Sequence, residues 1–244
     1  MELQGKTIIL TGAARIGQDV AMALKNRGVN LVITYLKDKQ EAALGFGAQA
    51  DVSKKEDVEN VVAATIKKFG NIDGLVHMAA IYKAMPWETL NEHDWDSNIN
   101  VIAKSAYLFG KIAGDQMLKN FGDPSANGSG QDIKGKMIFF SDWSALARPY
   151  KDHLPYNAAK AAVVGLAKSF AKELAPHVLV NAIAPGPILR PPDLTEEENE
   201  EVIANTPLKR WGGSEEITKG VLYLLEADFV TGTVLTIDGG RSIA

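Results

Sequence analysis

The chain has 244 residues, of which 46% are hydrophobic, a formal net charge of −4 and no cysteine. Strand and helix signals alternate without a linker, so a single domain over residues 1–244 is expected. The slightly acidic charge and the lack of long basic runs argue against nucleic acid as a partner. Disulfides are excluded, and no stretch reaches the roughly 18 apolar residues that a membrane span needs. A soluble, cytoplasmic protein is therefore expected.

The amino-terminal part of the chain has the pattern of a β-α-β unit. An apolar run over 7–10 predicts a strand, and a glycine-containing turn over 11–17 leads into a helix predicted over 18–27. Gly28 ends this helix, and the apolar run 31–35 predicts the next strand. Two strands joined by such a crossover are expected to lie parallel.

The same alternation continues to the end of the chain. The predicted elements are a short helix over 37–43, a strand over 48–51, a helix over 56–69, a strand over 74–79, a helix over 98–120, a surface loop over 122–130, a strand over 136–142, a helix over 158–174, a strand over 178–184, an acidic helix over 195–204 and a strand over 234–237. This order predicts an α/β fold, a doubly wound parallel sheet of about seven strands with helices on both faces. Ligands of such sheets bind at the carboxyl ends of the strands.

The pair Tyr156 and Lys160 carries the strongest chemical signal. Residues four apart share one face of a helix, so the Lys160 ammonium can lie beneath the Tyr156 phenol. A nearby positive charge lowers the pKa of a tyrosine from about 10, which lets it give a proton to a developing alkoxide near neutral pH. The same spacing occurs twice more, at Tyr35–Lys39 and at Tyr107–Lys111. Only Tyr156 follows a strand with a polar end and precedes an alanine-rich helix, so this pair predicts carbonyl reduction.

The turn after the first predicted strand is a candidate phosphate-binding loop. Gly12 and Gly17 are five positions apart with Arg15 and Ile16 between them, so the turn is one residue shorter than the usual G-x-x-x-G-x-G pattern. Backbone amides at such a turn and at the following helix amino terminus bind anions, which suits a pyrophosphate. A tight strand–helix connection is the alternative, and the alternation of the whole sheet favours the nucleotide.

The end of the second predicted strand indicates which nucleotide is bound. An acidic residue there would accept hydrogen bonds from the ribose hydroxyls of NAD and repel a 2′-phosphate. The stretch Thr34-Tyr35-Leu36-Lys37 contains no acid. Arg15 and Lys37 can instead contact a 2′-phosphate, which favours NADP(H) over NAD(H). The alternative is that both are solvated surface charges.

The segment 185–212 interrupts the regular pattern with several prolines around the acidic helix. Because it leaves the carboxyl end of a strand, it is a candidate lid over the substrate site, with a plain surface excursion as the alternative.

Several motifs occur together along the chain. They are Thr11-Gly12 with Gly17, Asp51-Val52, Asn100-Val101, Tyr156-x-x-x-Lys160, the run from Val180 to Gly186, and Asp238-Gly239-Gly240. Together they resemble the short-chain dehydrogenase/reductase family, classical type, over nearly the whole length. The resemblance implies a Rossmann-type fold with Tyr156 as the general acid of reduction. It also implies that Lys160 holds the nicotinamide ribose and lowers the Tyr156 pKa, and that Asn100 holds a water in a proton relay.

The resemblance also implies a nucleotide site and an assembly. The implied cofactor-binding residues, with those proposed above, are Gly12, Arg15, Ile16, Gly17, Tyr35, Lys37, Asp51, Val52, Ala79, Ala80, Tyr156, Lys160, Pro185, Gly186 and Ile188. Members of the family usually form tetramers, so a homotetramer is expected. The four histidines lack metal-ligand spacing, and no metal site is expected.

Two positions depart from the family pattern. Asp142 aligns with the usual active-site serine, although it lies fourteen residues before Tyr156, one more than usual. Ser141 and Ser144 are alternatives for this role, but Ser141 should point to the other face of the strand. The usual Asn-Ala-Gly after the fourth strand is Met78-Ala79-Ala80, which removes a polar side chain and a glycine near the cofactor.

An aspartate in the serine position, an arginine in the glycine turn and an aromatic residue at Tyr82 resemble the pteridine reductase branch. A carboxylate beside the acid tyrosine can relay protons to a ring nitrogen, and an aromatic face suits a flat heterocycle. The polar residues that usually accompany the ring are absent, since Ala80 and Ile81 stand there. The candidate substrate residues are Tyr82, Asp142, Trp143 and Leu189.

The leading hypothesis is an NADPH-dependent reductase that transfers hydride to a carbonyl or imine carbon, with a pteridine or another flat ring compound as candidate substrate. One alternative is a 3-oxoacyl thioester reductase, for which the chain lacks a strong basic cluster to meet an acidic carrier protein. The other is a non-catalytic nucleotide-binding regulator or scaffold. Met78-Ala79-Ala80 favours that alternative, and Asn100, Tyr156 and Lys160 argue against it.

Overall fold

The computed structural model describes residues 1–37, 42–120, 132–192 and 194–244. Its centre is a seven-stranded sheet in the order β3-β2-β1-β4-β5-β6-β7, and every adjacent pair of strands is parallel. The strands are β1 (Thr7–Thr11), β2 (Asn30–Tyr35), β3 (Phe46–Gln49), β4 (Gly74–His77), β5 (Gly135–Phe140), β6 (Val178–Pro185) and β7 (Val234–Ile237). The predicted doubly wound α/β sheet is confirmed.

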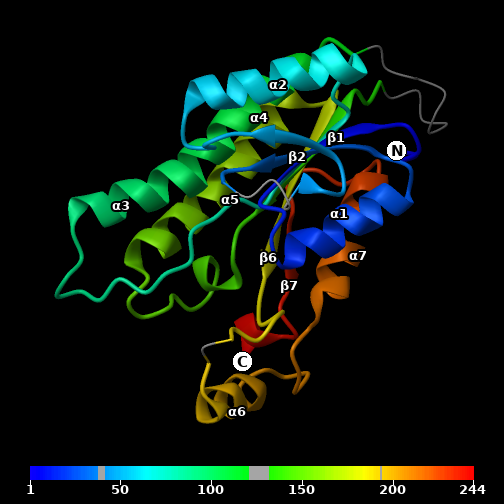
Figure 1. Ribbon diagram of the computed structural model, residues 1–244. Coiled ribbons are helices and arrows are strands. Elements are labelled where there is room, and N and C mark those ends of the chain that lie inside the picture. The colour runs from blue at the N-terminus through cyan, green and yellow to red at the C-terminus, as the bar shows by residue number, and fades with distance from the viewer. Residues whose placement is uncertain (38–41, 121–131, 193) are drawn as a thin grey trace.

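Helices cover both faces of the sheet (Figure 1). On one face lie α1 (Ile16–Asn26) and α7 (Ser214–Glu226), which pack against each other. On the other lie α2 (Lys55–Phe69), α4 (Ser105–Met117) and α5 (Leu154–Leu174). Two further helices, α3 (Glu92–Asn98) and α6 (Glu196–Ala204), extend beyond the layers. None of the described helices is both long and apolar enough to cross a bilayer.

The strands are apolar on both faces because each face meets a helical layer. Ile9 and Val32 belong to the core under α2, α4 and α5, while Ile8, Leu10 and Ile33 belong to the core under α1 and α7. Successive side chains of a strand point to opposite faces, so a continuous apolar run fills both cores. For this reason the strands could be predicted from short apolar runs in the sequence.

The strand order reverses between β1 and β4. The chain winds outward from β1 to β3 and then returns to place β4 on the other side of β1. Thr11 and His77, the last residues of these two strands, are register partners at the carboxyl edge of the sheet. Open parallel sheets bind ligands at such a switch point, and the candidate site lies at this edge.

Three predicted boundaries are corrected. The strand predicted over 48–51 runs over Phe46–Gln49, because Phe46 already pairs with Val32. The helix predicted over 98–120 begins, after the end of α3 at Asn98, with a π-helical stretch, Ile99–Lys104, and then continues as α4 to Met117. The helix predicted over 158–174 begins at Leu154, with a proline in its first turn, where no backbone donor is lost.

Two predicted segments fall on residues that the structure does not describe. Most of the short helix predicted over 37–43 lies within 38–41, and the loop predicted over 122–130 lies entirely within 121–131.

Candidate active site

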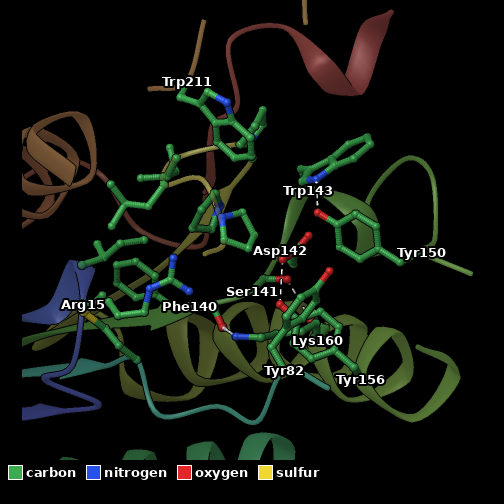
Figure 2. Close-up of a pocket in the computed structure, with 18 of the residues that line it drawn as sticks. Arg15, Tyr82, Phe140, Ser141, Asp142, Trp143, Tyr150, Tyr156, Lys160 and Trp211 are labelled. Atoms are coloured by element: carbon green, nitrogen blue, oxygen red, sulfur yellow. Dashed lines mark hydrogen bonds between the residues drawn. The ribbon is translucent and has the colours of Figure 1, made fainter. Parts of the chain in front are cut away.

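Tyr156 and Asp142 are joined by a direct hydrogen bond. The Tyr156 hydroxyl donates to Oδ2 of Asp142 at 2.7 Å, and the backbone N–H of Ser144 donates to Oδ1 at 2.9 Å. Figure 2 shows the two side chains facing each other. Tyr156 comes from the first turn of α5, and Asp142 lies two residues after the end of β5. The carboxylate of Asp142 is therefore held in place at both oxygens.

Lys160 lies one helical turn after Tyr156 and is 4% exposed. Its Nζ donates to the backbone oxygen of Phe140 at 2.7 Å and lies 5.7 Å from the centre of the Tyr156 ring. The Ser141 hydroxyl donates in return to the backbone oxygen of Lys160 at 2.9 Å. Two hydrogen bonds thus fasten α5 to the end of β5, and the Ser141 hydroxyl contacts the Lys160 backbone, whereas Asp142 contacts the Tyr156 hydroxyl.

The electrostatics of this cluster correct one prediction. Burial raises the pKa of Tyr156 well above its ordinary value, and the charge of Asp142 raises it further. Burial lowers the pKa of Lys160 to about 8, against the opposing effect of Asp142. The expected net lowering of the Tyr156 pKa is not found, because burial and the adjacent carboxylate outweigh the effect of the Lys160 charge.

Aromatic side chains form a wall beside Asp142. Trp143 Nε1 donates to the Tyr150 hydroxyl at 2.6 Å, and burial raises the pKa of Tyr150. The Tyr82 ring meets the Tyr156 ring edge to face at 5.1 Å between centroids and stacks on His153 at 4.6 Å. We call Tyr82, Trp143 and Tyr150 the aromatic wall. Flat rings pack well against such a surface.

The glycine turn lies on the other side of the site. Gly12 has φ of +73°, and a Cβ there would lie 2.7 Å from the backbone nitrogen of Ala79, so only glycine fits. Arg15, at the amino-terminal cap of α1, also has a positive φ of 50°. The Thr11 hydroxyl accepts the N–H groups of Met78 and Ala79, both at 3.2 Å. The turn is thus fixed against the end of β4.

A buried histidine extends this network, and no sequence motif indicated it. His77 Nδ1 lies 2.9 Å from the Thr11 hydroxyl, and Nε2 lies 2.9 Å from the Ser105 hydroxyl. Ser105 in turn donates to the backbone oxygen of Val101 in the π-helical stretch at 2.5 Å. Burial, with a smaller contribution from Lys160, lowers the pKa of His77 to about 3, so the ring is neutral. Since Thr11 already accepts two N–H groups, we assign its proton to the bond with Nδ1.

One cavity of about 390 Å³ joins the glycine turn to the aromatic wall. In Figure 2 Arg15 and Trp143 lie on opposite sides of the view, with Tyr156 and Lys160 lower in it. The residues singled out from the sequence that line it are Gly12, Arg15, Ile16, Gly17, Met78, Tyr82, Ser141, Asp142, Trp143, Tyr156, Lys160, Pro185, Gly186, Ile188 and Leu189. Lining residues that sequence reasoning left out include Val202, Trp211 and Arg241.

The other candidate residues lie outside this lining. Tyr35 is the last residue of β2 and Lys37 lies two positions further on, while Asp51 and Val52 come just after β3. Ala79 and Ala80 follow β4, and Asn100 lies in the π-helical stretch. Ser53 donates two hydrogen bonds to Asp51 Oδ1, which lower the pKa of that carboxyl.

The residues around the turn fit a dinucleotide. The glycine turn lies against the backbone at Met78–Ala79, and the first residues of α1 line the cavity. The ends of β2 and β3 continue the same edge of the sheet outward from β1. A phosphate is well bound at a helix amino terminus, and a nucleotide extends naturally along the strand ends.

Comparisons with known proteins identify the family of the chain. Residues 12–242 match the family model described as enoyl-(acyl carrier protein) reductase. The chain is 30% identical, over the full length of both proteins, to the 3-oxoacyl-(acyl-carrier-protein) reductase of Thermotoga maritima. The fold is similar to the aldohexose dehydrogenase of Thermoplasma acidophilum, with a TM-score of 0.87 and 27% identity over 99% of this chain and 96% of that one.

A Brucella melitensis structure described as a short-chain dehydrogenase/reductase of the glucose/ribitol dehydrogenase kind has a TM-score of 0.85 and 30% identity, covering 100% of this chain and 99% of the other. The chain is an oxidoreductase. It belongs to the short-chain dehydrogenase/reductase family. These relatives act on different substrates according to their names, so family membership leaves the substrate open.

Proposed function

We propose that the protein is an NADPH-dependent reductase that transfers hydride to a carbonyl or imine carbon. The observation that carries the proposal is the Tyr156–Asp142 hydrogen bond above Lys160, in a cavity shared with the glycine turn. The nucleotide, when bound, supplies the hydride. Tyr156 supplies the proton to the substrate oxygen or nitrogen, and the Lys160 ammonium stabilises the phenolate that remains.

The site differs from the usual family pattern because Asp142, and not a serine, stands beside the proton donor Tyr156. The carboxylate accepts a hydrogen bond from the Tyr156 hydroxyl and raises the Tyr156 pKa, so the tyrosine is held protonated at neutral pH. Because Asp142 is only half-buried, it can return a proton from solvent to Tyr156 after each turnover. Asn100, in the π-helical stretch, is proposed to hold a water in the same relay.

NADP(H) is the proposed nucleotide. Arg15 lines the cavity at the glycine turn, and the exposed Lys37 follows the end of β2. Two cations near the ribose favour a 2′-phosphate, whereas an acid at the end of β2 would repel it. Tyr35, Asp51 and Val52 lie along the strand ends that would flank the adenine half.

The remaining proposed contacts to the cofactor come from loops at the same edge. Ala79 and Ala80 follow β4 and would lie beside the nicotinamide half, while Pro185, Gly186 and Ile188 line the cavity after β6.

Two substrate classes have specific support. A flat ring compound, such as a pteridine, is supported by the aromatic wall and by Asp142, which can relay protons to a ring nitrogen. A 3-oxoacyl thioester is supported by the reductases to which the chain is similar. We favour the flat ring compound, because it would use both Asp142, which replaces the usual serine, and the aromatic wall.

The segment 185–212 is proposed as the lid of the substrate site. Its two ends are tied together, since the N–H of Gly212 donates to Pro187 and the N–H of Gly213 donates to Ile188, both at 2.9 Å. Between them α6 projects from the body of the molecule (Figure 1). Trp211 Nε1 donates to Asn199 of α6 at 2.9 Å, which joins the helix to a residue of the cavity lining.

A homotetramer is the proposed assembly. Large apolar side chains are exposed away from the cavity, and we expect them to be covered by other copies of the chain. They include Trp87, Trp95, Leu154, Phe229 and Ile243.

The test is a titration of the purified protein with NADPH and NADH, followed by reduction assays on dihydropteridines, quinones, diketones and acyl thioesters. Tight NADPH binding, with turnover that is lost in Tyr156→Phe, is the expected result and identifies the substrate class. Binding of neither nucleotide would contradict the proposal and favour a scaffold with the same fold.

A further inference from the structure

A cation in addition to Arg15 and Lys160 lines the cavity at its substrate end. Arg241 lies in the last turn of the chain and is half-buried. Its Cζ lies 5.5 Å from the centre of the Trp143 ring, so the guanidinium packs on the aromatic wall. The carboxyl-terminal 3₁₀ helix, drawn in red, lies beside Trp143 in Figure 2. Arg241 therefore borders the substrate region and lies apart from the glycine turn, where Arg15 stands.

The guanidinium has few partners for its donors. It donates to the backbone oxygen of Val202 at a long 3.4 Å. Among the described residues, no carboxylate oxygen lies within 4 Å of it. The carboxylate of Asp238, three positions earlier in the chain, accepts from the N–H groups of Gly240 and Ser242. A guanidinium carries five N–H donors, and most of those of Arg241 have no protein acceptor in the described chain.

The rest of the substrate end is apolar or aromatic. Besides the aromatic wall, its lining comprises Ile188, Leu189, Leu194, Val202 and Trp211. The carboxylate of Asp142 is already engaged by Tyr156 and Ser144. One half-buried cation on an apolar surface attracts an anion strongly, because water competes little there.

We propose that Arg241 binds a carboxylate carried by the substrate, so that the substrate class is a flat carbonyl or imine compound with a carboxylate away from the reacting carbon. The assignment rests on the proposed reductase function. A carboxylate fits better than a phosphate dianion, because Arg241 is the one cation of the lining at the substrate end. The other two cations of the lining are Arg15, at the glycine turn, and Lys160, beside Tyr156. A planar guanidinium binds a carboxylate through two parallel hydrogen bonds while its face stays on Trp143.

The competing role for Arg241 is purely structural. Its contacts with Trp143 and Val202 connect the aromatic wall to α6 of the lid. A structural role would affect charged and neutral substrates equally. An anion-binding role would affect only the charged ones, so matched pairs of substrates separate the two.

The experiment compares para-formylbenzoate with its methyl ester, and para-formylcinnamate with its methyl ester, using NADPH oxidation as the readout. The proteins are the wild type, Arg241→Met, Arg241→Lys and the control Arg148→Met. Arg148 is an exposed arginine that donates to the backbone oxygen of Ala244 and lies outside the cavity lining. We expect the wild type to prefer one acid over its ester by about 10- to 100-fold in kcat/KM.

Arg241→Met should abolish this preference, Arg241→Lys should keep part of it, and Arg148→Met should keep all of it. The ester rate and the NADPH affinity of each variant serve as the check on folding, because a misfolded variant loses both. Equal rates on acid and ester in the wild type, or a preference that persists in Arg241→Met, would overturn the anion subsite and leave the reductase proposal standing.

If none of the four compounds is reduced, a binding experiment tests the anion subsite directly. Para-formylbenzoate is then titrated by calorimetry into wild type and Arg241→Met, each saturated with NADP⁺. Binding that requires Arg241 would support the subsite and count against carbonyl reduction. Binding that is absent, or equal in the two proteins, would overturn the subsite.

Discussion

The chain contains the same four-residue spacing of tyrosine and lysine in two helices, with opposite environments. Tyr156 on α5 is 6% exposed and Lys160 is 4% exposed. Tyr107 on α4 is 49% exposed, and Lys111 forms an ion pair with Asp115 at 2.6 Å on the surface. The second pair faces solvent, where charges are screened and interact weakly.

The difference shows that spacing only places the two side chains on one helix face. Burial and the Asp142 carboxylate after β5 create the chemistry, because together they raise the pKa of Tyr156, while burial lowers that of Lys160. Tyr107 and Lys111 are therefore internal controls, with the same local sequence geometry and without the site.

The largest effect is expected from removing the Tyr156 hydroxyl. Tyr156→Phe deletes the proton donor, and we expect kcat to fall by about 10²- to 10⁴-fold, the usual contribution of a general acid. The measurement is steady-state reduction of the best substrate from the screen. The same change at Tyr107 should leave kcat within about twofold, since surface changes of this kind have small effects. Equal losses in the two variants would contradict the comparison.

The next effect is expected at Lys160. Lys160→Met removes the ammonium that stabilises the Tyr156 phenolate, and an opposite charge at this range is worth about 10- to 1000-fold in a proton transfer. We expect kcat to fall within that range, with a smaller change in NADPH affinity, measured by single-turnover kinetics and by titration. Lys111→Met keeps the helix and loses only a surface pair, so it should react at nearly the wild-type rate. An active Lys160→Met protein would contradict the assigned role.

A smaller effect is expected from Asp142→Ser, which tests whether the carboxylate sets the pKa of Tyr156. Asp142 raises the pKa of Tyr156 and also that of Lys160. Without it both pKa values fall, so the alkaline limb of kcat/KM for reduction should move to lower pH. At neutral pH the rate should change by less than about tenfold, since a proton donor remains.

The pH–rate profiles of the wild type and Asp142→Ser give the comparison directly. Asp115→Ser, which removes the acid beside Lys111, is the matched control and should leave the profile in place. An alkaline limb that stays in place or moves upward in Asp142→Ser would show that the carboxylate does not govern the proton donor.

Much of the fold was predictable because each strand is buried on both faces and is read as a short apolar run. The boundaries of β3 and the π-helical interruption at Ile99–Lys104 were not, since pairing with β2 decides the first and no helix-breaking residue marks the second. Tertiary contacts override local preference at such places.

The candidate site was predictable where a motif fixes it. Tyr156, Lys160 and the glycine turn come from local patterns, and the structure brings them to one cavity. Arg241 reaches the aromatic wall only through the folding of the last turn, more than eighty positions after Tyr156. The direction of the Tyr156 pKa shift depends on burial, which spacing does not reveal.

The smallest expected effect is on the pH dependence of stability, and it compares a buried histidine, His77, with an exposed one, His93. His77 has a pKa of about 3 in the folded protein against 6.5 in the unfolded chain, because burial disfavours its charged form. Between these values the unfolded chain binds more protons, so the His77 contribution to stability is lost as pH falls below 6.5. Lowering the pH from 7 to 5 should cost the wild type about 2 kcal/mol through this residue.

His77→Gln removes the titrating group and keeps polar atoms toward Thr11 and Ser105. We expect it to be less stable at pH 7 by about 1–3 kcal/mol, because a buried network loses its geometry, and to lose less further stability on acidification. Urea unfolding at pH 7 and pH 5 measures both. His93 is exposed on α3, so His93→Gln should follow the wild-type pH dependence. If His77→Gln followed it as well, the neutral buried histidine would not be the acid-sensitive group of the core.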